Sequence, residues 1–224
     1  SLLVHLLSMT PPSRLRVAVV ASEEALGQWE WLKWAPHSWS DSVQDDAGPA
    51  RMIATSWQDV AELLPEDLAE RGSFSYDATD TPMPYIIVVV DGGYVPIGSP
   101  IALSGGVNGV TVIDLPEKWG ALTSLSTLRL LLHPVSSLTR ATPMEVVRAG
   151  EDPALAVADM MDVATAQAVV RRLSSRFTTS GEASVNAPVG TTDPKRSADL
   201  LSLLDLGDVR DFDPDTDWRR RSGR

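Results

Sequence analysis

Tyr85-Ile86-Ile87-Val88-Val89-Val90-Asp91 is the stretch of sequence that decides the fold. The run from residue 85 to residue 90 is apolar without a polar alternation, which is typical of a strand buried on both faces. Strands of this kind occupy the middle of parallel sheets that helices cover on each side. Asp91-Gly92-Gly93 then ends the strand with a tight turn. We therefore expect residues 85–90 to form a central parallel strand.

The segments around this strand alternate between strand-like and helix-like patterns. Strand-like patterns cover residues 15–20, 51–54, 110–115 and 128–133, and helix-like patterns cover residues 1–9, 22–34, 57–71, 160–176 and 200–206. Ser22 is suited to cap one of these helices, and Thr55 or Ser56 to cap the next. Residues 38–50 and 72–84 are predicted loops. This order predicts an α/β fold, with a mostly parallel sheet flanked by helices.

The composition of the C-terminal part differs from that of the rest. We expect an α/β domain over residues 1–176, a flexible linker rich in Ser, Thr, Gly, Ala and Pro over residues 177–197, and a short helix with an acidic and Arg-containing tail over residues 198–224. The last two parts would form a helical and partly disordered extension. The chain opens at Ser1 in an apolar helical run without a start signal, so we interpret it as an internal fragment.

The overall composition disfavours several classes of function. The formal net charge of −11 disfavours binding to nucleic acid, which needs a basic surface. The absence of Cys excludes disulfides, thiol nucleophiles and Cys-based zinc sites. His5, His37 and His133 lie far apart and outside any metal-binding pattern, so we predict no metal site. The apolar run at residues 2–7 is too short to span a membrane.

Asp91 stands where a Walker B strand carries its acid. In that motif the Asp holds Mg²⁺ and a following Glu polarises the attacking water, but Gly92 and Gly93 occupy the place of the Glu. The alternative is that Asp91 only forms the turn after a buried strand. No Gly-Lys pair occurs, so the chain has no P-loop to hold phosphates. The Gly-rich segment 104–109 precedes a strand and is predicted to be a turn. We expect no catalytic residue here, and no nucleotide hydrolysis by this chain alone.

Three of the seven Trp residues lie close together in the segment 29–37. On a helix, Trp31 and Trp34 share a face, while Trp29 points elsewhere. These side chains fill the core in one interpretation and form a docking surface for a partner in the other. His37 follows a Pro and is expected to be a packing or capping group rather than a base.

Several segments, taken in order, resemble one family. They are residues 15–19, the Trp-rich segment 29–37, the hydrophobic-Asp-Gly-Gly strand 88–93, and residues 109–115, 158–161, 166–173 and 204–209. They resemble the EccC proteins, which are membrane-anchored FtsK/SpoIIIE-type ATPases of type VII (ESX) secretion systems in actinobacteria. The resemblance covers about residues 12–218, and the Trp-rich segment is its most specific part.

The resemblance implies a function without catalysis. The matching region of the family lies between the transmembrane helices and the first ATPase domain that has a P-loop, and has an ATPase-like fold with a degenerate nucleotide site. Asp91 matches the Walker B-like Asp and is the one candidate nucleotide-binding residue. This chain would then be a regulatory or scaffolding module on the cytoplasmic side of the cell membrane, in a motor that exports small helical proteins.

The resemblance also implies the partners and the cofactors. The partners would be the other domains of the same ATPase and membrane components of the secretion system, within an oligomer. ATP and Mg²⁺ would belong to the parent protein and not to this chain. Two other functions stay open: a nucleotide-binding or active ATPase domain that uses Asp91, and a free-standing interaction domain that docks through its Trp-rich segment.

Overall fold

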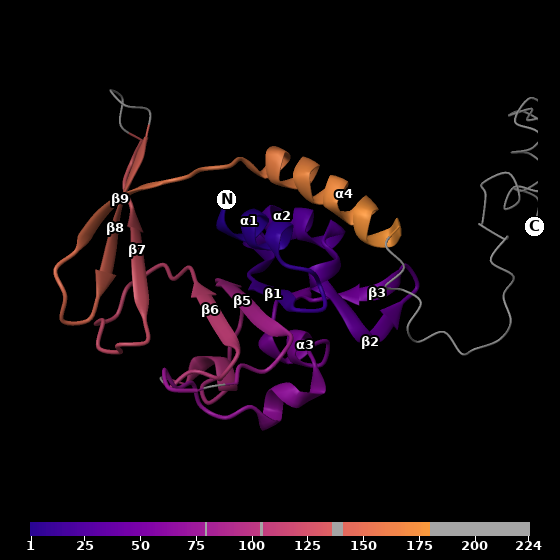
Figure 1. The fold of residues 1–224 in the computed structure, drawn as a ribbon, viewed down its shortest axis with the longest axis horizontal. Helices are drawn as coiled ribbons and strands as arrows, with labels where there is room; N and C mark the ends of the chain where they lie inside the picture. Colours follow the sequence, from indigo (N-terminus) through magenta and orange to yellow (C-terminus); the bar gives the residue numbers. More distant parts are fainter. Residues whose placement is uncertain (79, 104, 136–140, 180–224) are drawn as a thin grey trace, which may run out of the picture. The chain divides into compact units, whose positions relative to one another are not determined.

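The central feature of the fold is a parallel sheet with the strand order β4-β1-β5-β6. The computed structural model describes residues 1–78, 80–103, 105–135 and 141–179 of the chain (Figure 1). The four strands are β1 (Leu15–Ala21), β4 (Ile53–Ala54), β5 (Tyr85–Asp91) and β6 (Val110–Asp114). β5 lies between β1 and β6, and all of these neighbours are parallel. The predicted α/β class and the central position of residues 85–90 are confirmed.

The two central strands of the sheet are buried on both faces, as their apolar composition requires. Every residue of β1 is buried, and so is the middle of β5 from Ile86 to Val89. Successive side chains of a strand point to opposite faces. Val17 and Val19 of β1 therefore enter one core, while Ala18 and Val20 enter the other.

Helices cover each face of the sheet (Figure 1). Those on the first face are α1 (Leu2–Met9), α2 (Glu23–Trp29) and α4 (Val163–Thr179). Leu7 and Val170 are 1% exposed and belong to the core on this face. The second face is covered by α3 (Trp57–Ala61) and the short 3-10 helix η3 (Glu66–Glu70), which contribute Trp57, Val60 and Leu68. Burial of these apolar side chains is the main stabilising term of the fold.

The helix predicted over residues 22–34 is confirmed at its start and changes form at its end. The Ser22 side chain accepts a hydrogen bond from the Ala25 N–H at 3.2 Å, so it caps α2. After Trp29 the chain tightens into a 3-10 helix, η1 (Glu30–Trp34), followed by another, η2 (Pro36–Ser38). Two buried neighbours, Trp31 and Leu32, lie in this tighter segment, where packing outweighs α-helical propensity.

The helix predicted over residues 57–71 is shorter than expected. α3 ends at Ala61, and η3 begins only at Glu66. Pro65 separates them, because a proline has no backbone N–H and cannot continue an α-helix.

The prediction of a loop over residues 38–50 was wrong. This segment forms an antiparallel hairpin of β2 (Trp39–Asp45) and β3 (Gly48–Arg51). Its sequence is polar and lacks a regular alternation, so the strand signal is weak. Contacts between the two strands stabilise the hairpin instead: the Arg51 guanidinium stacks on the Trp39 ring at 4.7 Å. The strand predicted over residues 51–54 is reduced to β4 as a result.

The strand predicted over residues 128–133 exists, but it belongs to a separate sheet. β7 (Leu128–Leu132), β8 (Thr142–Arg148) and β9 (Ala154–Ala158) form an antiparallel sheet in that order. The last two strands were not predicted. β9 is rich in Ala, which has a low β propensity, so pairing with β8 decides its conformation.

The C-terminal predictions are tested only in part. α4 confirms a helix close to the predicted residues 160–176, displaced by three residues at each end. The rest of the linker beyond Thr179, the helix over residues 200–206 and the tail lie outside the described residues. Among the described residues, no helix has both the length and the apolar character needed to cross a membrane.

Candidate functional site at the carboxyl end of the parallel sheet

Asp91 and Trp29, which lie 62 residues apart in the chain, meet at the carboxyl end of β5. The Trp29 indole N–H donates a hydrogen bond to Asp91 Oδ2 at 2.8 Å. Trp29 is the last residue of α2 and packs against the core of the first face. The carboxylate that the sequence singled out as a Walker B-like acid is therefore bonded to a neutral donor of the protein itself.

The chain beyond Asp91 runs across the ends of the neighbouring strands. Gly92 forms an antiparallel bridge with Ala21, the last residue of β1. The Tyr94 N–H then donates to the Thr55 carbonyl at 2.9 Å, just after the end of β4. Ligands of open parallel sheets bind in the crevice outside the carboxyl ends of the strands. Residues 92–94 fill that position over β1 and β4.

This crossing depends on the two glycines. Gly92 has a φ of +69°, which favours glycine. A Cβ at Gly93 would lie 2.6 Å from the Val20 carbonyl carbon and 2.7 Å from the Ala21 nitrogen. The residue at position 93 must therefore be glycine for the crossing segment to lie this close to β1.

The two helices that begin at this end of the sheet are poorly suited to bind phosphate. A phosphate needs free backbone N–H groups and a positive potential at the helix N-terminus. The side chain of Ser22 caps α2, and that of Ser56 accepts from the Asp59 N–H of α3 at 3.3 Å. The first turns also carry acids, Glu23 and Glu24 in α2 and Asp59 in α3. Their negative charge opposes an anionic ligand.

Asp114 is a second carboxylate at this end that the sequence analysis did not single out. It pairs with Val90 in the sheet register, so its side chain points to the face opposite that of Asp91. Burial raises the pKa of its carboxyl group, and a hydrogen bond from the Leu115 N–H partly opposes this shift. The two carboxylates do not converge. Among the residues that the structure describes, no cluster of three or more acidic, His or Cys side chains could hold a metal.

The other Trp residues of the cluster have different surroundings. Trp31 is 7% exposed and packs in the core with Val170 of α4. Trp34 is 38% exposed, and the Arg171 guanidinium of α4 stacks on its ring at 4.4 Å. Trp31 and Trp34 thus both meet α4, whereas Trp29 meets Asp91.

His37 is a buried packing group. It is 1% exposed, and its Nε2 lies 2.8 Å from the Thr10 carbonyl, to which it donates a hydrogen bond. Burial lowers the pKa of His37; the hydrogen bond to Thr10 opposes this effect and the positive charge of Arg16 adds to it. His37 thus bonds to the residue that follows α1, whereas Asp91 bonds to Trp29 of α2.

We expect His37 to make stability depend on pH. In the unfolded chain its pKa is near 6.5, and in the folded chain it is lower, so the unfolded state binds more protons between these two values. The contribution of neutral His37 to the free energy of unfolding should be fully present above pH 6.5. It should fall as the pH is lowered from 6.5 toward the pKa of the folded state. Urea titrations at several pH values would measure this loss. A His37→Gln variant should lose less free energy of unfolding over the same pH range. If the variant and the wild type showed the same dependence on pH, His37 would not be the group responsible.

We expect Trp29→Phe to destabilise the protein by about 1–2 kcal/mol, because it removes a hydrogen bond to a charged and half-buried acceptor. Chemical denaturation would measure the change. Trp34→Phe is the matched control, with an expected loss below about 0.5 kcal/mol because an aromatic ring remains for Arg171 to stack on. In an Asp91→Ala background, Trp29→Phe should cost less, since the acceptor is gone. Equal costs in the two backgrounds would show that the hydrogen bond is irrelevant.

Two further groups of interacting residues were not predicted from the sequence. Arg16 is 9% exposed, and its guanidinium donates to both carboxylate oxygens of Asp41 in the hairpin. The only signal was a charged residue inside an apolar strand. The second group surrounds Tyr85 at the opposite end of the sheet, where Phe74 and Tyr76 line a pocket. Its signal was an aromatic pair in a predicted loop.

The fold and this site define an α/β domain with a parallel sheet, in which the Asp at the carboxyl end of β5 is hydrogen-bonded to a Trp of the same chain. No family model matches the chain. An ESX secretion system protein EccC of Thermomonospora curvata is 32% identical over 227 residues. The match covers 100% of this chain and 16% of the length of the relative. The ESX-5 secretion system protein EccC5 of Mycobacterium tuberculosis is 26% identical over 94% of this chain and 15% of its own length. The ESX-1 secretion system protein EccCa1 of the same organism is 30% identical over 78% of this chain and 21% of its own length.

These matches assign the chain to the EccC family, of which it represents one segment. The chain spans about a sixth of the length of the first of these curated relatives. All three relatives are named as proteins of ESX secretion systems.

Proposed function

We propose that this chain is a non-catalytic segment of an EccC-type secretion ATPase, in which it positions or regulates the domains that hydrolyse ATP. The observation that carries the proposal is the state of the carboxyl end of the sheet. Asp91 is hydrogen-bonded to Trp29, and residues 92–94 lie across the ends of β1 and β4. A nucleotide would have to displace this segment before it could reach the carboxyl ends of β1 and β4.

Charge supports the same proposal. The phosphates of Mg·ATP are anionic, whereas the helix N-termini at this end carry Glu23, Glu24 and Asp59. No Gly-Lys pair is present to provide a phosphate-binding lysine. Asp91 also lacks a neighbouring Glu, because Gly92 and Gly93 follow it and Gly93 has no room for a side chain. Of the groups that catalyse phosphoryl transfer in P-loop ATPases, the sequence keeps the Walker B-like Asp91 but has neither the Gly-Lys pair nor a Glu next to that Asp.

The relatives support the cellular context that we propose. Because they are named as ESX secretion system proteins, we infer that the parent protein takes part in protein export through a type VII system. We further propose that it is anchored in the cell membrane, that this segment lies on the cytoplasmic side, and that ATP and Mg²⁺ bind to other domains of the same oligomeric protein. The partners of this segment are then those domains and other components of the secretion system.

Calorimetric titration of the chain with Mg·ATP tests the proposal. We expect no saturable heat up to millimolar nucleotide, which corresponds to a binding free energy weaker than about −4 kcal/mol. An ATP turnover that disappears in Asp91→Asn would overturn the proposal in favour of an active ATPase domain. Saturable binding without turnover would favour a nucleotide-sensing domain instead.

The same substitution in the full-length parent gives a second test. Asp91→Asn retains an acceptor for the Trp29 N–H but removes the charge that an active Walker B site would need to hold Mg²⁺. If this segment is non-catalytic, the ATPase rate of the parent and the export of its substrates should stay within about twofold of wild type, a change of roughly 0.4 kcal/mol. A loss of the ATPase rate with unchanged stability would contradict the proposal.

A further inference from the structure

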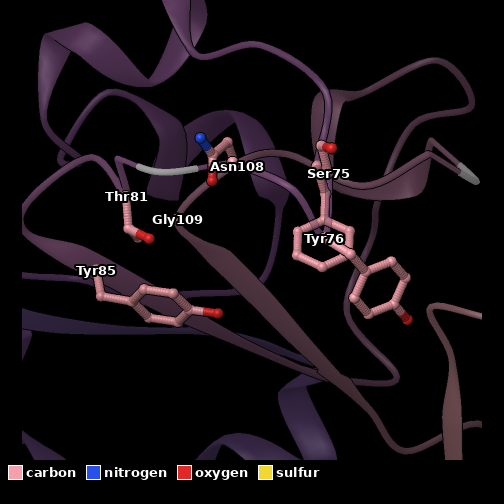
Figure 2. Close-up of a pocket in the computed structure, with 8 residues that line it drawn as sticks. Ser75, Tyr76, Thr81, Tyr85, Asn108 and Gly109 are labelled. Atoms are coloured by element: carbon pink, nitrogen blue, oxygen red, sulfur yellow. The ribbon is translucent and has the colours of Figure 1, made fainter.

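The end of the sheet opposite to Asp91 contains an aromatic pocket of about 250 Å³ (Figure 2). Tyr85 is the first residue of β5, and Asn108 and Gly109 directly precede β6, so the pocket lies at the amino ends of these strands. Phe74 and Tyr76 come from the segment that leads from η3 to β5. Figure 2 shows Ser75, Tyr76, Thr81 and Asn108 around the space beside the Tyr85 ring.

Hydrogen bonds hold the two segments that form this pocket. The Phe74 N–H donates to the Gly106 carbonyl at 3.4 Å, and the Asn108 N–H donates to the Gly72 carbonyl at 2.9 Å. The Asn108 side-chain amide also donates to the Asp80 carbonyl at 3.2 Å. The pocket therefore belongs to the folded structure.

The aromatic rings are fixed in orientation. Phe74 and Tyr76 meet edge to face, with ring centres 4.9 Å apart and an angle of 76° between the ring planes. The hydroxyl groups of Tyr85 and Thr111 are 2.7 Å apart, and the Tyr76 hydroxyl donates to the Leu125 carbonyl at 3.0 Å. Tyr76 is nonetheless 73% exposed. Aromatic faces are electrically negative and attract cations that approach within about 6 Å.

The charges near the pocket also favour a cation. Asp77 and Asp80 are exposed members of the loop that forms one wall. Arg71, whose side chain is 2% exposed, is paired with Asp67 at 2.9 Å. Its Nη2 donates to the Pro84 carbonyl at 3.0 Å and its Nη1 to the carbonyl of the lining residue Gly109 at 3.4 Å, so this guanidinium is already hydrogen-bonded within the chain. The net charge of −11 adds a long-range attraction for a basic partner.

We propose that this pocket binds the guanidinium of an arginine side chain presented by a partner protein segment. A guanidinium is planar and weakly hydrated, so it can stack on an aromatic ring while its N–H groups bond to acceptors in the same plane. The hydroxyls of Thr81 and Ser75 and the amide oxygen of Asn108 provide such acceptors around the pocket.

The described part of the chain already uses this type of contact. Arginine guanidinium groups stack on Trp rings in three places, at 4.7 Å on Trp39, 4.5 Å on Trp119 and 4.4 Å on Trp34. The pocket beside Tyr85 offers comparable ring faces without an arginine of its own among its lining residues.

The test is a titration of the chain with N-acetyl-arginine methylamide, a probe whose termini carry no charge, followed by chemical-shift changes of the Tyr76 and Tyr85 ring protons. The control probe is the citrulline analogue, which has the same shape without the charge. We expect saturable binding of the arginine probe on the order of 10 mM, and binding of citrulline at least about tenfold weaker. Equal binding of the two probes would overturn the proposal and indicate a site for neutral peptide side chains.

Substitutions locate the site. Tyr76→Ala should weaken binding of the arginine probe about fivefold, which matches a cation–π contribution of about 1 kcal/mol. Its high exposure means that it should leave the fold intact. Tyr94→Ala, at a 64% exposed tyrosine near the other end of the sheet, is the matched control and should have no effect. An unchanged affinity in Tyr76→Ala, or no saturation by the arginine probe, would refute the proposal. Neither result bears on the nucleotide titration, which concerns the opposite end of the sheet.

Discussion

Gly93→Ala should destabilise the protein by roughly 3 kcal/mol, since overpacking against a rigid neighbour is among the more costly single substitutions. The new methyl group would lie 2.6 Å from the Val20 carbonyl carbon and 2.7 Å from the Ala21 nitrogen. These are main-chain atoms of a central strand, so they cannot rotate away as a flexible side chain could. The free energy of unfolding from urea titration, together with the far-ultraviolet circular dichroism, would measure the effect.

Gly27→Ala is the matched control for this experiment. A Cβ at Gly27 meets no atom within 4 Å, and the residue lies inside α2. Alanine in a helix interior is about 1 kcal/mol more favourable than glycine, so this variant should be slightly more stable than the wild type. If Gly93→Ala changed stability by no more than Gly27→Ala, the close approach of residues 92–94 to β1 would be refuted. The main argument that these residues cover the carboxyl ends of β1 and β4 would then be lost.

Trp31→Ala should cost about 3–5 kcal/mol, as expected when a large aromatic side chain is removed from a core. Trp31 is 7% exposed and packs with Leu32, Val170 and other members of the first core. Its loss would leave a cavity between η1 and α4. Thermal and urea unfolding should both shift strongly, because the loss is a large fraction of the stability of an ordinary domain.

Trp34→Ala distinguishes the two interpretations of the Trp cluster. Trp34 is 38% exposed, and its main described contact is the guanidinium of Arg171. We expect a loss of only about 1 kcal/mol. If Trp34→Ala were as destabilising as Trp31→Ala, the division of the cluster into a core residue and a surface residue would be wrong. If both were mild, the core assignment of Trp31 would fail.

Much of the fold followed from local patterns. The apolar run at residues 85–90 predicted a central strand, and β5 occupies that position. Ser22 predicted the start of a helix, and its side chain caps α2. These predictions succeed because burial of a continuous apolar strand and capping of a helix by a serine depend on residues that are close in sequence.

The strands that the sequence patterns missed depend on pairing with other strands. The hairpin of β2 and β3 has a polar sequence, and its register and the stacking of Arg51 on Trp39 hold it together. β8 and β9 form because each finds a neighbour in an antiparallel sheet. Strand pairing depends on the partner more than on the intrinsic preference of the segment.

The candidate site divides in the same way. The sequence by itself determined that Asp91 follows an apolar strand, that no Gly-Lys pair is present, and that two glycines follow Asp91, because these facts depend on residue type and order. Only the tertiary structure decided that Trp29 donates to Asp91 from 62 residues away and that Gly93 lies against β1. Such contacts depend on how the sheet brings the ends of α2, β1 and β5 together. A local sequence pattern cannot predict them, because the residues lie far apart in the chain.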